Sequence, residues 1–238
     1  MHKPEADTIS RVTILTDTAI KGHHLVDALD TIQITHPLDE SFKRFVKRTC
    51  DIVFSLVVIV AVLSWLIPLL AIIIKLTSKG SVFFVQARTG YNNQTFNCWK
   101  LRSMVRNEDA DHKQATANDM RITFAGKYLR KFSLDELPQF YNVLIGDMSI
   151  VGPRPHMLYH TKEFAKEVTM YDLRHGIKPG ITGLAQVLGY RGEITDKHAL
   201  HNRIRLDIFY MKKWSLGLDV YIMFKTIKLL LFGDKSAF

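Results

Sequence analysis

The longest apolar stretch of the chain runs from Ile52 to Ile74 and is interrupted only by Ser55, Ser64 and Pro68. About 23 residues of this kind form a helix of roughly 34 Å, which is long enough to cross a bilayer. Pro68 removes one helical hydrogen bond and clashes with the carbonyl group of Ser64. We therefore expect these two residues to form a break in the helix.

We place the membrane helix at about residues 50–76, and basic residues flank both ends of its apolar run, Ile52–Ile74. Before it lie Lys43, Arg44, Lys47 and Arg48, and after it lie Lys75, Lys79 and Arg88. The positive-inside rule favours a cytoplasmic location for both ends. A re-entrant helix, which enters the membrane and returns to the same face, satisfies the charge pattern and the break together. A kinked helix that spans the bilayer is the alternative, and the pattern favours the two equally.

A second pattern, strand-like on both sides of a turn, predicts a small β-hairpin. Val82–Gln86 and Thr95–Trp99 are rich in strand-forming residues, and Gly90–Asn93 between them is typical of a turn. With the helical patterns on either side, this hairpin predicts an α+β fold that is mostly helical.

The C-terminal segment, Asp207–Phe232, has apolar residues at a helical period. One face carries Val220, Met223, Phe224, Ile227 and Leu230, and off it lie Asp219, Lys225 and Lys228. Such an amphipathic helix suits the plane of a membrane interface. A helix that faces a protein core is the alternative.

The first forty residues are mixed and polar. Val12–Leu15 and Thr31–Thr35 resemble short strands, and Lys21–Leu29 resembles a short helix. A segment of this length rarely forms a core of its own. No basic region followed by an apolar run opens the chain, so we expect no signal peptide. We expect residues 1–40 to be the tail of an N-terminal soluble domain that precedes the main domain, residues 41–238.

Charge narrows the range of partners, because the 238 residues carry a formal net charge of +9. A basic protein of this kind needs an anionic partner, such as nucleic acid, a phosphorylated substrate or anionic lipid. The sequence has no recognised nucleic-acid-binding module, and its apolar helix argues against one, so we expect no nucleic-acid partner. Cys50 and Cys98 form no CxxC pair, and no histidine spacing matches a zinc motif.

The candidate chemistry centres on Ser133–Gln139, which contains two adjacent carboxylates, Asp135 and Glu136. A basic segment precedes them, and a cluster of cations around two carboxylates suits phosphoryl chemistry. The alternative is a capping box, in which Ser133 is the N-cap residue and Glu136 is the third residue of a helix.

Six basic residues are candidates for contacts with phosphate or with a nucleotide: Arg154, Lys100, Arg102, Arg121, Arg130 and Arg191. Prolines fix the backbone on both sides of Arg154 in Gly152–Pro155, which would hold its cation at a set place. Arg191 lies between glycines in Gly189–Gly192. A solvated basic face that attracts anionic lipid is the alternative for some of these residues.

A series of motifs in residues 41–233 resembles the bacterial monotopic phosphoglycosyl transferases. The motifs, in the order typical of that family, are Lys47-Arg48-x-x-Asp51, Gln86-x-Arg88-x-Gly90, Lys100 to Met104, Arg121 to Thr123, Leu129 to Gln139, Gly146 to Pro155 and Lys178 to Gly183. Gly189–Glu193 and His156 are most similar to the undecaprenyl-phosphate glucose (or galactose) phosphotransferase branch. Ile67 stands before Pro68 where the family often has serine, but this departure does not touch the acidic pair.

The resemblance implies a catalytic domain in residues 41–238 that lies on the cytoplasmic face of the bacterial inner membrane. It implies that Asp135 attacks the β-phosphate of a UDP-sugar and releases UMP. Undecaprenyl phosphate then takes the sugar-1-phosphate from the aspartyl intermediate. Glu136 is expected to help deprotonate the lipid phosphate or, with Asp135, to bind Mg²⁺.

Other implications concern the substrate and the assembly. Glucose is the expected sugar, and galactose or an N-acetylated amino sugar are the alternatives. The product would enter exopolysaccharide or glycoconjugate synthesis. A non-catalytic membrane-surface adaptor is a more distant alternative, and the long members of the family suggest a homodimer.

Overall fold

We describe a computed structural model of the chain, in which residues 35–105, 116, 119–192, 194 and 196–232 are described. The described residues belong almost entirely to one compact unit, His36–Phe238. The strands and the helix predicted within the first forty residues lie outside the described residues.

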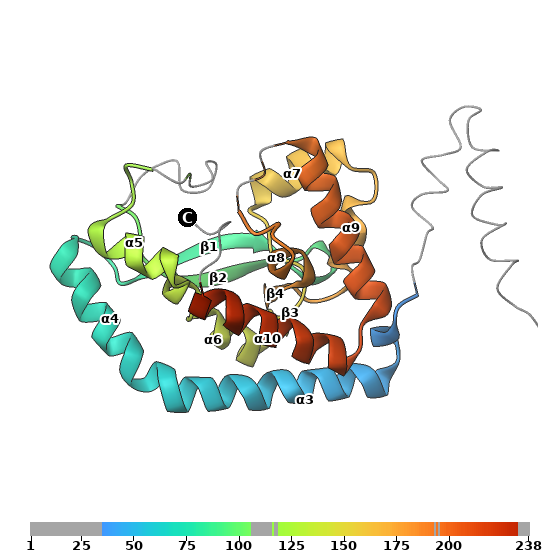
Figure 1. Cartoon of the computed structure of the whole chain (residues 1–238), viewed down its shortest axis with the longest axis horizontal. Coiled ribbons are helices and arrows are strands. Elements are labelled where there is room, and N and C mark those ends of the chain that lie inside the picture. Colours follow the sequence, from blue (N-terminus) through green and yellow to red (C-terminus); the bar gives the residue numbers. More distant parts are fainter. Residues whose placement is uncertain (1–34, 106–115, 117–118, 193, 195, 233–238) are drawn as a thin grey trace, which may run out of the picture. The chain divides into compact units, whose positions relative to one another are not determined.

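The described unit is mostly helical, as the sequence predicts (Figure 1). Its helices are α3 (Ser41–Val58), α4 (Ser64–Thr77), α5 (Phe124–Lys131), α6 (Gln139–Ile145), α7 (Leu158–Glu167), α8 (Leu184–Val187), α9 (Lys197–Lys213) and α10 (Leu216–Phe232). Its strands are β1 (Phe83–Thr89), β2 (Thr95–Leu101), β3 (Ser149–Val151) and β4 (Gly180–Thr182). These strands form two separate two-stranded sheets, one antiparallel and one parallel.

The predicted apolar helix forms one continuous helical run, Ser41–Thr77, which is long and apolar enough to cross a membrane. A π-helical segment, Ile59–Leu63, joins α3 to α4, and the helix axis changes direction between them (Figure 1). The hydroxyl of Ser64 donates to the carbonyl of Val60 over 2.7 Å, while Pro68 lies inside α4. Only 22% of the most apolar stretch is buried, so most of this helix faces outward.

The predicted hairpin is confirmed: β1 pairs with β2 in an antiparallel register that places Val85 opposite Trp99. Asn92 and Asn93 adopt φ values of 51° and 58° in the turn, and asparagine tolerates this left-handed conformation better than most residues. Because side chains alternate along a strand, Gln86 and Cys98 point inward.

The C-terminal segment differs from the single helix that its apolar period predicts. The chain breaks between α9 and α10 at Trp214 and Ser215. Asp219, predicted to lie off the apolar face, is buried, and its carboxylate accepts a bond of 2.8 Å from Lys47 Nζ. Asp219 thus belongs to a buried ion pair near the start of α10. The predicted apolar face is largely exposed, as at Phe224, which is 65% exposed.

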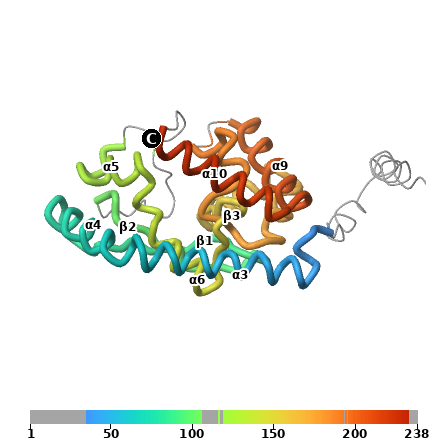
Figure 2. The backbone as a smooth tube through the Cα atoms, turned by 60° about the horizontal axis from the view of Figure 1, so that its bottom comes forward, coloured from blue at the N-terminus to red at the C-terminus, as the bar shows by residue number. Residues whose placement is uncertain are grey.

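A buried apolar cluster supports the region between α4, β2 and α5. Its members are Leu70, Ile74, Leu101 and Leu129. Leu134 and Leu137, which flank the acidic pair, pack against this cluster. On the other side, α6 packs along α3 (Figure 2). The acidic pair is therefore anchored on a packed apolar base.

Candidate active site

The acidic pair lies in a 3-10 helix, Leu134–Glu136, and α6 begins three residues later at Gln139. Ser133 precedes the pair in the left-handed region at φ 56°, a sparsely populated conformation for serine. The Ser133 hydroxyl makes no capping bond and instead accepts from Arg191 Nη2 over 2.5 Å. The capping-box alternative is therefore wrong.

Three cations surround Glu136. Lys100 Nζ lies 3.0 Å and Arg154 Nη2 lies 2.6 Å from Glu136 Oε1, while Arg191 Nη2 lies 3.8 Å from Oε2. Burial alone would raise the pKa of Glu136, but Arg154, Lys100 and Arg191 hold the pKa well below its usual value. Glu136 is thus a fully ionised, tightly held carboxylate.

Asp135 and Glu136 are buried to the same degree, because each is 7% exposed. Their environments nevertheless differ. Within the described part of the chain, no group donates a hydrogen bond to the Asp135 carboxylate. Burial raises the pKa of Asp135, Lys100 opposes this, and the negative charge of Glu136 raises the pKa further. Two adjacent carboxylates with pKa values shifted in opposite directions are typical of a catalytic site.

The backbone on either side of Arg154 is fixed by its neighbours in the fold. Gly152 lies so close to the β4 region that a Cβ added there would come within 2.4 Å of the Lys178 carbonyl oxygen. The Arg154 carbonyl accepts a bond of 2.6 Å from Arg174, and the next carbonyl, that of Pro155, accepts 2.7 Å from Arg88. The structure therefore holds Arg154 at a set place beside Glu136.

Arg174 is itself part of a buried network that the sequence did not reveal. Its guanidinium donates to Asp207 Oδ2 over 2.8 and 2.9 Å, and both residues are almost completely buried. Nearby, His156 Nδ1 lies 2.6 Å from the hydroxyl of Tyr171. These partners are far apart in the chain and follow no motif. Gln86-x-Arg88 and His156, which both belong to the family resemblance, were the sequence signals for this part of the site.

The other predicted cations lie in different surroundings. Arg102 donates to the carbonyls of Ser78 and Lys79 over 2.7 and 2.6 Å, so it fixes the C-terminal end of α4. Arg121 pairs with Asp119 over 2.6 Å. Arg130 is close enough to lower the pKa of Asp135, although burial dominates that shift. The structure thus brings Lys100, Arg154 and Arg191 onto Glu136, with Arg130 near the pair, and gives Arg102 a different contact.

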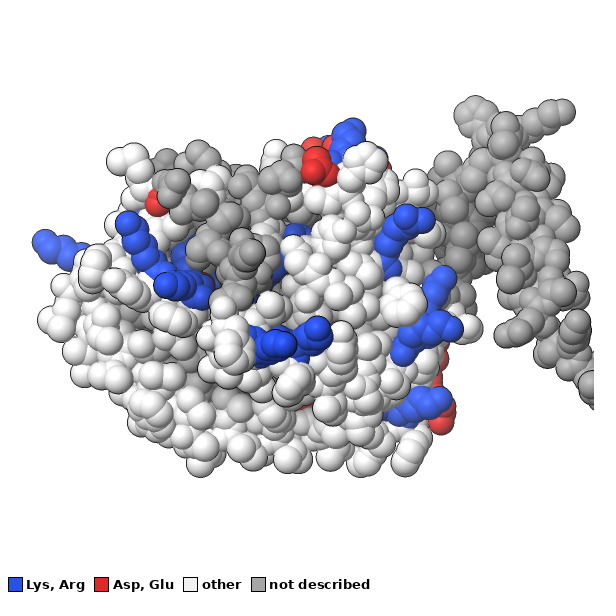
Figure 3. All heavy atoms as spheres, in the orientation of Figure 1, with Lys and Arg blue, Asp and Glu red and all other residues white. Residues whose placement is uncertain are grey.

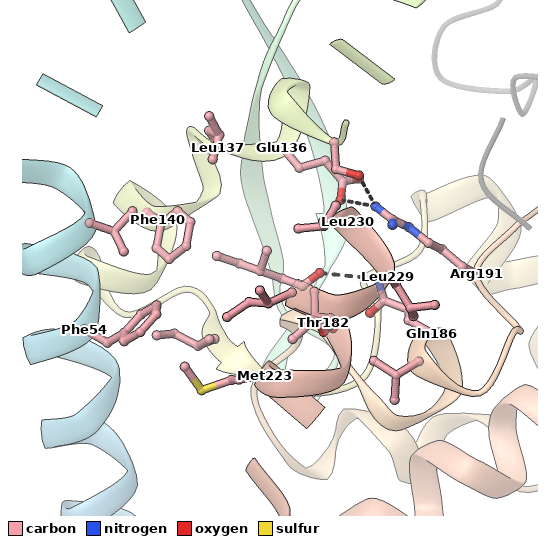
Figure 4. A pocket seen from close by; sticks show the side chains of 17 residues that line it. Phe54, Glu136, Leu137, Phe140, Thr182, Gln186, Arg191, Met223, Leu229 and Leu230 are labelled. Atoms are coloured by element: carbon pink, nitrogen blue, oxygen red, sulfur yellow. Dashed lines mark hydrogen bonds and ion pairs between the residues drawn. The ribbon is translucent and has the colours of Figure 1, made fainter. Parts of the chain in front are cut away.

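A pocket of about 260 Å³ opens beside Glu136 (Figure 4). Its walls are mostly apolar and come from α3, α6, the two short strands, α8 and α10. Glu136 and Arg191 lie together at one end of it, and Met223 lies toward the other end (Figure 4). Charged and apolar surfaces therefore meet at the acidic pair.

The molecular surface is likewise divided into apolar and charged regions. In Figure 3 a largely uncharged band follows the lower edge, where Figure 1 places α3, and basic side chains gather above it.

In the described residues, no group of three His, Cys, Asp or Glu side chains is placed to hold a metal ion.

The fold and the site define a class of protein that combines an outward-facing apolar helix with two adjacent buried carboxylates, one of which is surrounded by basic side chains. The chain belongs to the family described as Bacterial sugar transferase, whose model matches residues 42–233. The resemblance seen in the sequence motifs is therefore confirmed.

Curated relatives agree with this assignment. The chain is 46% identical to a UDP-glucose:undecaprenyl-phosphate glucose-1-phosphate transferase of Klebsiella pneumoniae, over 76% of this chain and 39% of the relative. A protein of the same name from Escherichia coli (strain K12) is 39% identical, over 93% of this chain and 49% of the relative. A UDP-N-acetylgalactosamine-undecaprenyl-phosphate N-acetylgalactosaminephosphotransferase of Aeromonas hydrophila is 41% identical, over 90% and 50%. The chain spans half or less of the length of these relatives.

Proposed function

We propose that this chain transfers a sugar-1-phosphate, with glucose as the expected sugar, from a UDP-sugar to undecaprenyl phosphate and releases UMP. Family membership and the names of the relatives support the reaction class. The observation that carries the proposal is the contrast within the acidic pair. Asp135 is buried and accepts no hydrogen bond from the described residues, whereas Glu136 beside it is held by cations.

In the first step, a carboxylate oxygen of Asp135 attacks the β-phosphorus of the UDP-sugar. The bond from this phosphorus to the oxygen that bridges the two phosphates breaks, and UMP leaves with that oxygen. An acyl phosphate bearing the sugar remains on Asp135. A carboxylate without hydrogen-bond donors keeps its lone pairs available, and its raised pKa makes it the more basic nucleophile.

In the second step, a phosphate oxygen of undecaprenyl phosphate attacks the same phosphorus. The acyl phosphate bond breaks, the Asp135 carboxylate is regenerated and the lipid carries a diphosphate linked to the sugar. Glu136 has a lowered pKa and holds Lys100 and Arg154 in place, so we assign it the task of fixing these cations around the reacting phosphorus. It is also the candidate to take a proton from the lipid phosphate.

Mg²⁺ is the expected metal ion. Mg²⁺ is usually bound by one or two carboxylates and completes its shell with substrate phosphates and water. The pair fits this pattern through Asp135, because the oxygens of Glu136 are engaged by cations. When bound, Mg²⁺ would neutralise the charge that develops as UMP leaves. Dependence of UMP release on added Mg²⁺, with loss in EDTA, tests this assignment.

The long apolar helix is proposed to enter the cytoplasmic face of the inner membrane and return to it. Its exposed apolar surface, its change of direction and its basic flanks support this arrangement (Figure 1). Labelling of single cysteines at residues 43 and 79 in inside-out and right-side-out vesicles tests it. Access to both from the cytoplasmic side is expected, and access to the two from opposite sides would contradict a re-entrant helix.

The identity of the sugar needs its own test, because the relatives are named for glucose and for N-acetylgalactosamine. Glucose is proposed because it occurs in the names of two of the three relatives. Galactose or an N-acetylated amino sugar remain the alternatives. Purified protein with Mg²⁺ and undecaprenyl phosphate, given each UDP-sugar in turn, is expected to release UMP fastest with UDP-glucose.

Asp135→Asn tests the reaction itself, because the amide cannot form the acyl phosphate. We expect loss of UMP release with expression unchanged, whereas appreciable turnover would reject Asp135 as nucleophile. If the wild-type protein releases no UMP with any donor, the adaptor alternative gains support. The assignment of residues 1–40 to a soluble domain and the homodimer stay predictions.

A further inference from the structure

We propose that the apolar pocket beside Glu136 holds the first isoprene units of the polyprenyl phosphate acceptor, with the phosphate on Arg191. This inference rests on the proposed function and adds the place where the acceptor binds. It commits the pocket to one occupant, a branched, unsaturated hydrocarbon chain that ends in a phosphate.

The walls of the pocket suit a hydrocarbon. They consist largely of aromatic and branched aliphatic side chains, among them Phe54, Phe140, Ile150, Ile181, Ile227 and Leu230.

Three hydroxyls and one amide also line the pocket. Thr182 and Thr226 bond to each other over 2.6 Å, Thr226 bonds to the carbonyl of Ile222 over 2.8 Å, and the third hydroxyl, that of Ser133, accepts from Arg191 over 2.5 Å. These hydroxyls are therefore satisfied within the wall. Gln186 donates to the carbonyl of Ile181 over 3.3 Å, and its Oε1 has no partner among the described residues. A nucleotide would find Gln186 Oε1 as an unpartnered acceptor in these walls and would leave most of its own polar groups without partners.

The polar end of the pocket suits a phosphate. Arg191 Nη2 contacts Ser133 at 2.5 Å and lies 3.8 Å from Glu136, a longer separation than those of Lys100 and Arg154. A guanidinium carries five donors, and these two contacts use only Nη2. Arg191 can therefore donate to phosphate oxygens while it stays beside the acidic pair.

The pocket also opens in the direction from which a membrane lipid would arrive. Phe54 and Ile227 line it and are nevertheless 37% and 51% exposed. The outer faces of the same helices continue as exposed apolar surface, at Val57 of α3 and at Phe224 of α10. A chain that leaves the pocket thus meets apolar surface rather than charge.

The size of the pocket limits what it holds. Its volume of about 260 Å³ lies just below the roughly 300–1,000 Å³ typical of ligand pockets. It therefore takes only the segment of a long prenyl chain nearest the phosphate. The remainder would extend along α3 and α10 into the bilayer. This division predicts that recognition depends on the units next to the phosphate more than on total chain length.

The test fills the pocket with Leu230→Trp and uses Leu231→Trp as the matched control. Leu230 lines the pocket, while its neighbour Leu231 lies outside it and is 74% exposed. The donor is UDP-glucose, or UDP-galactose if the wild-type protein releases UMP from that donor instead. With this donor, L230W is expected to raise the KM for undecaprenyl phosphate at least about tenfold. L231W is expected to keep the wild-type KM.

A burst of UMP without any acceptor reports the first half-reaction separately. A wild-type protein without such a burst or turnover would overturn the proposed function itself. A normal wild-type protein with equal KM values in L230W and L231W would overturn only the pocket assignment. If L230W does not fold, the wild-type protein in bilayer nanodiscs is photolabelled with farnesyl phosphate that carries a diazirine on its first isoprene unit.

Labels are expected on α3 and α10 near Phe54 and Leu230. Undecaprenyl phosphate should compete with labelling, whereas excess phosphatidylglycerol should not. Labels elsewhere in the chain, or equal competition by phosphatidylglycerol, would overturn the assignment.

Discussion

Asp135 and Asp219 have the same exposure, 7%, and opposite surroundings. Asp219 accepts hydrogen bonds from Lys47 Nζ at 2.8 Å, Tyr210 at 2.6 Å and Trp214 at 3.1 Å. Asp135 accepts none from the described residues. A carboxylate without donors around it has its oxygens available to a ligand or a reacting atom, whereas a carboxylate that already accepts three hydrogen bonds does not. Satisfaction of hydrogen bonds, rather than burial, separates the structural carboxylate from the reactive one.

The largest expected effect is on stability. Asp219→Asn leaves Lys47 buried without its counter-charge, and breaking a buried pair in this way costs about 3–5 kcal/mol. Asp135→Asn removes a buried charge that has no hydrogen-bond donors, so its free energy of unfolding should stay unchanged or rise. Thermal unfolding of both variants in the same detergent measures the difference. Equal destabilisation by the two substitutions would contradict the comparison.

Glu136→Gln should lower the rate strongly, because it releases Lys100 and Arg154 from their common partner. Loss of one preorganised electrostatic group costs roughly 10²–10³-fold in kcat, and we expect a loss in this range. The substitution also removes a negative charge that raises the pKa of Asp135.

The residual activity of this variant gives a second readout. An ionised nucleophile loses activity as the pH falls through its pKa, so the acid limb of the E136Q pH–rate profile should move to lower pH. A limb that stays in place would argue against electrostatic coupling within the pair.

Arg174→Lys tests whether the hydrogen bond from Arg174 to the Arg154 carbonyl holds Arg154 in position. Lysine keeps the charge near Asp207 but cannot donate to Asp207 and to the Arg154 carbonyl in the same forked geometry. We expect a loss of roughly tenfold in kcat, or about 1.4 kcal/mol, with a smaller change in KM. Arg205→Lys, on the exposed side of α9, is the matched control. A loss of stability without any change in kcat would make Arg174 merely structural.

The effect that is smallest near neutral pH concerns a buried histidine. Burial, with Arg174 adding to it, lowers the pKa of His175 to about 3. The unfolded chain binds this proton near pH 6.5 and the folded chain does not, so stability is lost as the pH falls from about 6.5 toward 3. The slope for one group is at most about 1.4 kcal/mol per pH unit.

Denaturant unfolding of His175→Asn at several pH values should therefore give a flatter profile than the wild-type protein. His198→Gln, at an exposed position, should leave the profile unchanged. A His175→Asn profile as steep as the wild type would assign the acid sensitivity to other groups.

Local patterns predicted much of this fold. The apolar run Ile52–Ile74, the hairpin around Gly90–Asn93 and the acidic pair are all properties of contiguous residues, and the structure has a helix, a hairpin and a buried pair there. The tight approach of Arg154 to Glu136 also agrees with the rigid Gly152–Pro155 segment.

The features that the sequence did not predict depend on contacts between distant residues. The parallel pair of β3 and β4 contains three residues in each strand, too few to produce an alternating pattern. The ion pair of Lys47 with Asp219, which follows the helix break at Trp214, joins residues that are 172 positions apart. In the sequence, Arg102 looked like the basic residues that surround Glu136. Only its contacts with the end of α4 in the structure show that it has a different role.

The central claim is that Asp135 is the nucleophile, and a covalent adduct tests it most directly. Protein given UDP-glucose and Mg²⁺ without a lipid acceptor, quenched in acid and digested, is analysed by mass spectrometry. The account predicts the mass of one hexose phosphate on the peptide that contains Asp135, lost on addition of undecaprenyl phosphate and absent from Asp135→Asn. UMP release in the presence of lipid with no adduct at any time, or an adduct that persists in Asp135→Asn, would contradict it.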